Sequence, residues 1–447
     1  MTDTDPALML GESRAASRKT GKRNHWRLLR LAAIDLGPLR SHRDFRLFFI
    51  GRAITNLGTM VSTVAVMYQV FALTRSPLAV GVFGIVEFAP MLLFAFVGGA
   101  LADALDRRWI AQFTELALAV LSGLLLINAL QPMPRLWALY LVSMVAAALS
   151  ALQRPALSAL LPRIVERDEI VAAAALMKAL QSIGQILGPA IAGILIAYAG
   201  LPVVYGIDVA SFVVSLLALR LMHAVPPPSN AGRPSIRSIF DGLSFLRGQP
   251  LLLSTYLVDM IGTFFGFPTA LLPAFAVFFT RGNSGIPAAS ALGLLYAAPA
   301  VGALLAAVSS GWTRHVHRHG LGVMLAVMVW GIASVGLGLA PSLPLAFTCL
   351  ALVGGANMVS GVFRSAISNA TIPDALRGRL AGVELIAYTS GPVLGDVEAG
   401  AVATIFTPQI SAFSGGVLCL LGVSLLMLAL PGLRRYDHRD SRSAANG

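Results

Sequence analysis

Apolar stretches long enough to cross a membrane recur along this chain from Phe45 to Leu430. Each holds about twenty residues, and a helix of that length covers the ~30 Å hydrocarbon layer at ~1.5 Å per residue. Within lipid, the backbone N–H and C=O groups must find partners inside the segment, which a single stretch can provide only as a helix. The chain is therefore predicted to be an all-α polytopic membrane protein.

The composition agrees with this class. Charged residues make up 12% of the chain and apolar residues 56%, whereas soluble domains carry about 25% charged residues. The net charge of +12 is concentrated in the tails and in alternate short loops, which argues against a nucleic-acid partner because no single basic face is formed. Both cysteines, Cys349 and Cys419, fall inside apolar stretches, so no disulfide framework is expected.

Turns rich in proline and glycine divide the apolar stretches into twelve predicted spans. Examples are Ser76-Pro77, Gly200-Leu201-Pro202 and Thr407-Pro408, which interrupt a helix because proline lacks the N–H donor. The predicted spans are residues 46–73, 78–101, 109–130, 136–161, 170–198, 202–222, 250–279, 289–312, 321–340, 345–368, 381–405 and 412–430.

The basic residues predict the orientation of these spans. With both tails on one side, that side holds 25 of the 33 Lys and Arg residues, and the opposite side holds three, Arg75, Arg135 and Arg281. Cytoplasmic loops of membrane proteins are enriched in Lys and Arg. Both termini are therefore expected in the cytoplasm, in a multi-pass protein of the cell (inner) membrane.

The longest internal connection divides the spans into two sets of six. Arg154-Pro-Ala-Leu-Ser in the fourth span is echoed by Arg364-Ser-Ala-Ile-Ser in the tenth, as expected of two related bundles around a central site. Chance recurrence is the alternative. The predicted organisation is a basic N-tail with an amphipathic segment that can lie on the membrane surface (1–45), a first bundle (46–222), a cytoplasmic linker (223–249), a second bundle (250–430) and a C-tail (431–447).

A glycine, acidic and basic pattern follows the second span. The sequence is Gly98-Gly99-Ala100-Leu101-Ala102-Asp103-Ala104-Leu105-Asp106-Arg107-Arg108, and it resembles the signature between spans 2 and 3 of the major facilitator superfamily. The resemblance implies a gating role for Gly99, Asp103, Arg107 and Arg108, with the glycine packing closely and the carboxylate docking on a helix N-terminus of the other bundle. Ala104 stands where the signature usually has a basic residue. The alternative is a solvated charged turn.

The fifth span carries Gly184, Gly188, Pro189 and Gly193. This run resembles the Gly-Pro signature of antiporters in the superfamily, which implies a gate built on close helix packing and a proline bend. A structural kink of any helical bundle is the alternative. The stretches Leu295 to Pro299, Leu376 to Gly382 and Gly395-Asp396 resemble the drug-efflux family, in particular its enterobactin-exporting branch.

Three acidic residues lie deep in predicted spans: Glu87, Asp396 and Glu398. Intramembrane carboxyl groups often carry protons in transporters, so these three are candidates for proton or substrate coupling. Asp396 and Glu398 are two residues apart and cannot face the same side of a helix. Asp396 is favoured because it belongs to the Gly-Asp pair that matches the exporters. A buried acid satisfied by a neighbouring Ser, Thr or Arg is the alternative.

One face of the first span is polar. Arg52, Asn56, Thr59 and Thr63 follow helical spacing, which predicts a cavity wall together with Asp259 of the seventh span. A helix-packing stripe is nearly as plausible for the four residues, and Arg52 lies shallow enough for its charge to reach the membrane surface.

These features predict a secondary exporter, driven by the proton gradient and needing no other cofactor, that moves an enterobactin-like siderophore or similar small molecule out of the cytoplasm. A multidrug efflux pump is the alternative within this class, followed by a nutrient importer and a non-transporting membrane sensor. The chain has no phosphate-binding Gly-x-x-x-x-Gly-Lys-Ser/Thr loop, so an ATP-driven pump is not expected. No soluble catalytic domain is evident in the sequence, so the protein is not expected to be an enzyme. The cluster His315, His317 and His319 is read as a basic loop rather than a metal site, and the protein is expected to act as a monomer.

Overall fold

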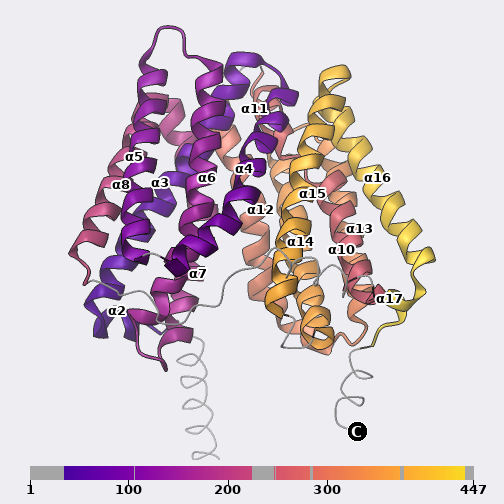
Figure 1. Cartoon of the computed structure of the whole chain (residues 1–447). Helices are drawn as coiled ribbons and strands as arrows, with labels where there is room; N and C mark the ends of the chain where they lie inside the picture. The colour runs from indigo at the N-terminus through magenta and orange to yellow at the C-terminus, as the bar shows by residue number, and fades with distance from the viewer. Residues whose placement is uncertain are drawn as a thin grey trace, which may run out of the picture.

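A computed structural model of the chain describes residues 35–104, 106–223, 246, 248–281, 285–372 and 377–437, without the side chains of residues 95–104, 377–379, 381–383 and 385. The described part is helical (Figure 1). Its long helices are α3 (Arg43–Thr74), α4 (Pro77–Ala104), α5 (Arg107–Leu130), α6 (Leu136–Leu160), α7 (Ile170–Tyr198), α8 (Leu201–Leu221), α10 (Pro250–Gly266), α12 (Ala288–Ser309), α13 (His319–Gly338), α14 (Leu343–Thr371), α15 (Arg377–Ile405) and α16 (Pro408–Ala429). The short elements are α2 (Gly37–Ser41), η1 (Leu161–Arg163), η2 (Thr269–Leu271), α11 (Leu272–Phe279), η3 (Ser310–His315) and α17 (Pro431–Arg435).

The twelve predicted spans correspond to these elements, and the all-α membrane class is confirmed. In the described residues, eleven segments are long and apolar enough to cross a membrane by length and composition. The helix outside that set is α15, which carries five charged residues and nevertheless runs alongside α4 and α10. Two of its acids contact other elements of the protein: Glu384 accepts a hydrogen bond from Tyr256 of α10, and Asp396 accepts one from Ala270 of η2. A charge held against protein costs less than one in lipid.

The seventh span is broken, so the prediction of one continuous helix over residues 250–279 is wrong. Helix α10 ends at Gly266, and the chain passes through η2 before α11 begins. Pro268 lacks an N–H and disfavours helical backbone at Phe267, which has φ −126° and ψ 69°. The carbonyl of Gly266 freed by the break accepts hydrogen bonds from Trp330 Nε1 at 2.7 Å and Ser334 Oγ at 2.6 Å. The break is therefore a satisfied part of the fold.

The two ends of the molecule differ in what they carry. We call the end with α2 and α17 the tail end, and the end with the short turns that follow α3, α5, α7, α11, α13 and α15 the hairpin end (Figure 1). Helices α3 to α8 pack among themselves, as do α10 to α16, and the two groups meet mainly along two seams, α7 with α12 and α4 with α15. The predicted linker, residues 223–249, falls almost wholly outside the described residues.

Apolar packing joins the two groups at the hairpin end, whereas the buried apolar side chains described at the tail end pack within each group. One buried cluster at the hairpin end takes Phe83 and Tyr205 from the first group and Phe275 and Leu292 from the second. At the tail end, each group has its own cluster: one contains Phe45, Leu160 and Leu219, and the other contains Leu252, Ile367 and Leu433. Since buried apolar contact is what holds such helices together, the passage between the groups is sealed at the hairpin end.

Candidate transport passage

Glycines bring the two groups into contact along both seams. A Cβ on Gly193 of α7 would stand 2.7 Å from the carbonyl oxygen of Ala289 and 3.0 Å from the Cα of Gly293 on α12. A Cβ on Gly81 of α4 would meet the backbone of Asp396 on α15. Small residues allow this close approach of helix backbones. The seal at the hairpin end thus depends on positions that cannot accept a side chain.

The remaining residues of the fifth-span signature hold α7 against α3. Gly184 lies under the side chain of Asn56, whose Nδ2 donates to the carbonyl of Leu180 at 3.4 Å. Gly188 lies under Met60. The carbonyl oxygen of Pro189 faces Gly293 across the seam. Of the predicted gating positions in this span, Pro189 and Gly193 lie at the seam between the groups, and Gly184 and Gly188 pack inside the first group.

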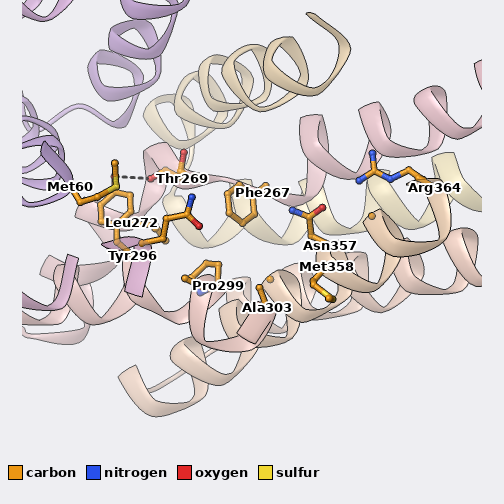
Figure 2. A pocket seen from close by; sticks show the side chains of 14 residues that line it. Met60, Phe267, Thr269, Leu272, Tyr296, Pro299, Ala303, Asn357, Met358 and Arg364 are labelled. Atoms are coloured by element: carbon orange, nitrogen blue, oxygen red, sulfur yellow. Dashed lines mark hydrogen bonds between the residues drawn. The ribbon is translucent and has the colours of Figure 1, made fainter. Parts of the chain in front are cut away.

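A cavity of about 390 Å³ opens between the two groups (Figure 2). Met60 of α3 and Gln185 of α7 supply the wall from the first group, and α10–α11, α12 and α14 supply the rest. The side chains are apolar and aromatic with a few polar ends, as is usual for small-molecule pockets of ~300–1,000 Å³. The lining residues are Met60, Gln185, Phe267, Thr269, Leu272, Tyr296, Pro299, Ala300, Ala303, Gly354, Asn357, Met358, Gly361 and Arg364.

A buried ion pair adjoins this cavity. Arg364 Nη1 of α14 lies 2.6 Å from Asp259 Oδ1 of α10, and the two side chains are 8% and 4% exposed. The guanidinium also lies 4.9 Å from the centre of the Tyr388 ring of α15, a cation–π distance. The side chain of Arg364 thereby links α14 to α10 and α15 and also lines the cavity.

The family follows from comparison with known proteins. Residues 33–446 match the model of the transmembrane secretion effector family. The chain belongs to this family of the major facilitator superfamily. The enterobactin exporter EntS of Escherichia coli O6:K15:H31 (strain 536 / UPEC) is 30% identical over 93% of this chain and 98% of its own length. EntS of Shigella boydii serotype 18 is 31% identical over 92% and 98%.

Solved transporter structures share the fold of this secretion-effector family member. The nucleoside transporter NupG covers 88% of this chain and 100% of its own with a TM-score of 0.70 and 13% identity. A bacterial homologue of the iron transporter ferroportin, in an inward-facing state, covers 88% and 99% with a TM-score of 0.61 and 19% identity. The predicted major facilitator fold is confirmed, and the relatives found by sequence are transporters of small molecules.

The three acids predicted for coupling, Glu87, Asp396 and Glu398, lie in different surroundings in the secretion-effector chain. Asp396 accepts a hydrogen bond from Ala270 N at 2.8 Å and another from Thr269 Oγ1. Its carboxylate thus ties α15 to the break in the seventh span. Glu398 shares a helix face with the exposed Leu394 and Ile405. Asp396 thus has hydrogen-bond donors in this structure, and its predicted role in coupling stays a prediction.

Glu87 is a partly buried acid of α4. Val82, Ile85 and Leu93 form an exposed apolar side of α4, and at 3.6 residues per turn Glu87 lies roughly opposite them. The exposed Phe94 lies seven residues after Glu87 and shares its face. No hydrogen bond or ion pair to Glu87 is present among the residues that the structure describes. Glu87 is not among the side chains that line the cavity, and its role in proton or substrate coupling stays a prediction.

The polar residues of the first span mainly contact other residues of the first group. Arg52 Nη1 lies 3.3 Å from Glu115 Oε1 of α5, and Asn56 packs on α7 as described above. Thr63 Oγ1 donates to the carbonyl of Thr59 at 2.8 Å. The cavity itself is lined by Met60 rather than by these four residues, and by Arg364 rather than by the predicted wall residue Asp259.

The basic pair after the second span anchors helix ends at the tail end. Arg107 Nη1 donates to the carbonyl of Ala159 at 3.1 Å, and Arg108 Nε donates to that of Leu219 at 2.9 Å. The side chains of Gly99 and Asp103, the other two predicted gating positions, lie outside the described residues. Among the described residues, no group of three His, Cys, Asp or Glu side chains is suited to a metal ion, and this includes His315, His317 and His319.

Single neutralisation of the Arg364–Asp259 pair is expected to destabilise the protein. Arg364→Gln or Asp259→Asn leaves one buried charge without its counter-ion, at a cost of about 3–5 kcal/mol. The double variant removes both charges and should recover most of that loss. Apparent melting temperatures of the detergent-purified proteins compare the stability of the wild type, the single variants and the double variant. Equal losses for the single and double variants would contradict a coupled pair.

Proposed function

We propose that this chain is a proton-driven exporter of an enterobactin-like siderophore from the cytoplasm. The carrying observation is the match to enterobactin exporters along 92–93% of this chain and 98% of theirs. A match of that extent covers every span and both seams, so the relation is not confined to a packing motif. The cavity of about 390 Å³ lies between the two groups, where related folds bind their substrates.

Both termini are proposed to lie in the cytoplasm. The tail end carries the large excess of Lys and Arg, which favours the cytoplasmic side. In this orientation the seal at the hairpin end faces outward, and the passage opens inward. A substrate would enter from the cytoplasm, and opening of the two glycine seams would release it outside.

Proton coupling is proposed to depend on Glu87. Its side chain is partly buried and has no described partner, so a proton can bind and leave without breaking an existing contact. Asp396 is proposed instead to couple opening of the α4–α15 seam to the seventh span. Its carboxylate contacts η2, and its backbone contacts Gly81 of α4. Opening of the α4–α15 seam would therefore disturb the broken seventh span directly.

Deletion of the gene tests the proposed substrate. The culture supernatant of the deletion strain should lose most of its iron-chelating metabolite, and the cells should retain it. The reason is that deletion removes the proposed route out of the cytoplasm. The wild-type chain should restore secretion, and the Gly293→Val chain described in the Discussion should not. Normal secretion combined with increased susceptibility to a panel of drugs would contradict siderophore export and favour multidrug efflux.

A further inference from the structure

We infer that the passage recognises its ligand by negative charge, with Arg154 and Arg364 binding an oxyanion group from opposite groups of helices. This inference rests on the proposed function only in taking the cavity as the route of a transported molecule. It adds the chemical class of the ligand and the residues that hold it.

Arg364 supplies a buried cation at the cavity. Its Nε and Nη1 atoms are covered by the protein, and Nη1 lies 2.6 Å from Asp259. The guanidinium thus has a close counter-ion on one side, and its side chain lines the cavity. Figure 2 places Arg364 at one end of the cavity and Met60 and Tyr296 at the other. A ligand with an oxyanion at one end and an aromatic body fits this arrangement, since guanidinium groups bind oxyanions through paired hydrogen bonds.

Arg154 occupies the corresponding position in the first group. It lies in the repeat Arg154-Pro-Ala-Leu-Ser that matches Arg364-Ser-Ala-Ile-Ser, on α6 rather than α14. Its side chain is exposed, on a different side of α6 from the exposed apolar residues Leu141 and Val145. It is close enough to Arg52 for the two charges to repel each other, and the described residues form no ion pair with it.

The charges at matching positions of the two helix groups explain why Arg154 has no ion-pair partner among the described residues. In the second group, the paired positions on α10 and α14 carry Asp259 and Arg364, which neutralise each other. In the first group, the matching positions on α3 and α6 carry Arg52 and Arg154, which are both positive. Glu115 compensates Arg52 and leaves Arg154 uncompensated.

A third cation extends this surface toward the tail end. Lys178 is exposed and lies seven residues before Gln185, hence on the face of α7 that lines the cavity. In the tail-end half of the first group, Arg154 and Lys178 are thus two exposed cations of the spans, whereas the nearby Arg52 is paired with the buried Glu115. Such a surface gathers anions and guides them inward.

Ligand binding to the purified, full-length protein in nanodiscs tests this inference. The probes are salicylate and salicylamide, which share a hydroxylated ring and differ in one negative charge, and titration calorimetry measures both. We expect salicylate to bind at least about tenfold more tightly than salicylamide. Arg154→Gln, which breaks no ion pair among the described residues, should weaken salicylate by about tenfold and leave salicylamide unchanged.

The contribution of Arg364 must be tested with a variant that still folds. The double variant Arg364→Gln with Asp259→Asn removes the pair without leaving a buried charge and should also weaken salicylate about tenfold. Arg434→Gln is the matched control, because it removes an exposed tail-end cation of α17 outside the passage, and it should have no effect.

Three outcomes would overturn the inference: no saturable salicylate binding in the millimolar range, equal binding of the two probes, or unchanged binding in either passage variant. None of these depends on siderophore secretion. A charge-selective site in a protein whose deletion leaves secretion intact would reject the proposed function and keep this inference.

Discussion

Glu87→Gln is expected to abolish accumulation driven by a pH gradient while substrate exchange continues. Glutamine keeps the size and polarity of the protonated acid but cannot release a proton. Net transport in reconstituted vesicles should fall to background, a loss of at least about tenfold, as expected when an intramembrane ionisable group in a proton pathway is removed. Exchange of labelled for unlabelled substrate should stay within about twofold, because it needs substrate binding and movement of the seams but no proton release.

The matched control is Glu398→Gln. It makes the same chemical change in α15, on the face shared with exposed apolar residues, and should leave both measurements unchanged. Asp396→Asn should slow net transport and exchange together, since it alters the contact with Ala270 rather than a proton site. If Asp396→Asn removed the pH dependence and Glu87→Gln did not, the assignment of the proton site would be reversed.

Gly293→Val is expected to stop export by preventing closure of the hairpin end. A Cβ at this position would stand 2.9 Å from the Cα of Gly193 and would also meet the carbonyl oxygen of Pro189. These are backbone atoms, so no side chain can move aside. Overpacking of this kind costs about 1–3 kcal/mol, and a cost confined to the sealed state shifts its population by roughly 5- to 150-fold.

Secretion of the siderophore at equal expression measures this effect. Gly206→Val in α8 is the control, because a Cβ at Gly206 has no neighbour within 4 Å and the substitution should be tolerated. Normal secretion by Gly293→Val would show that the α7–α12 seam need not close as tightly as the structure indicates.

The spans could be predicted because hydropathy and turn residues act locally. Each apolar stretch must be a helix whatever its neighbours are, so the ranges agree with the structure within a few residues. The seventh span differs from the predicted continuous helix because Pro268 and Pro273 lie inside one apolar stretch. A proline can end a helix there when another helix satisfies the carbonyl group that the break frees. Trp330 and Ser334 do so here, and their positions depend on packing.

The site was less predictable because it depends on which helix faces meet. Asp259 and Arg364 are 105 residues apart in sequence, and nothing local indicates that they pair. Of the seam glycines, Gly193 belongs to a glycine signature, whereas Gly81 and Gly293 lie outside the signatures. The cavity is lined by Phe267 and Met358, whose residue types are common throughout an apolar chain. The sequence signal that points to Arg364 is the repeat, because Arg364 occupies the position that Arg154 holds in the first bundle.

The most direct test of the account is the side from which the cavity can be reached. After replacement of Cys349 and Cys419, both buried, a single cysteine at Met358 should react with a membrane-impermeant maleimide in everted vesicles but not in intact cells. Added substrate and a proton gradient should make it reactive from the outside as well. Labelling from the outside alone, or from neither side under any condition, would contradict a passage that is sealed at the hairpin end and open to the cytoplasm.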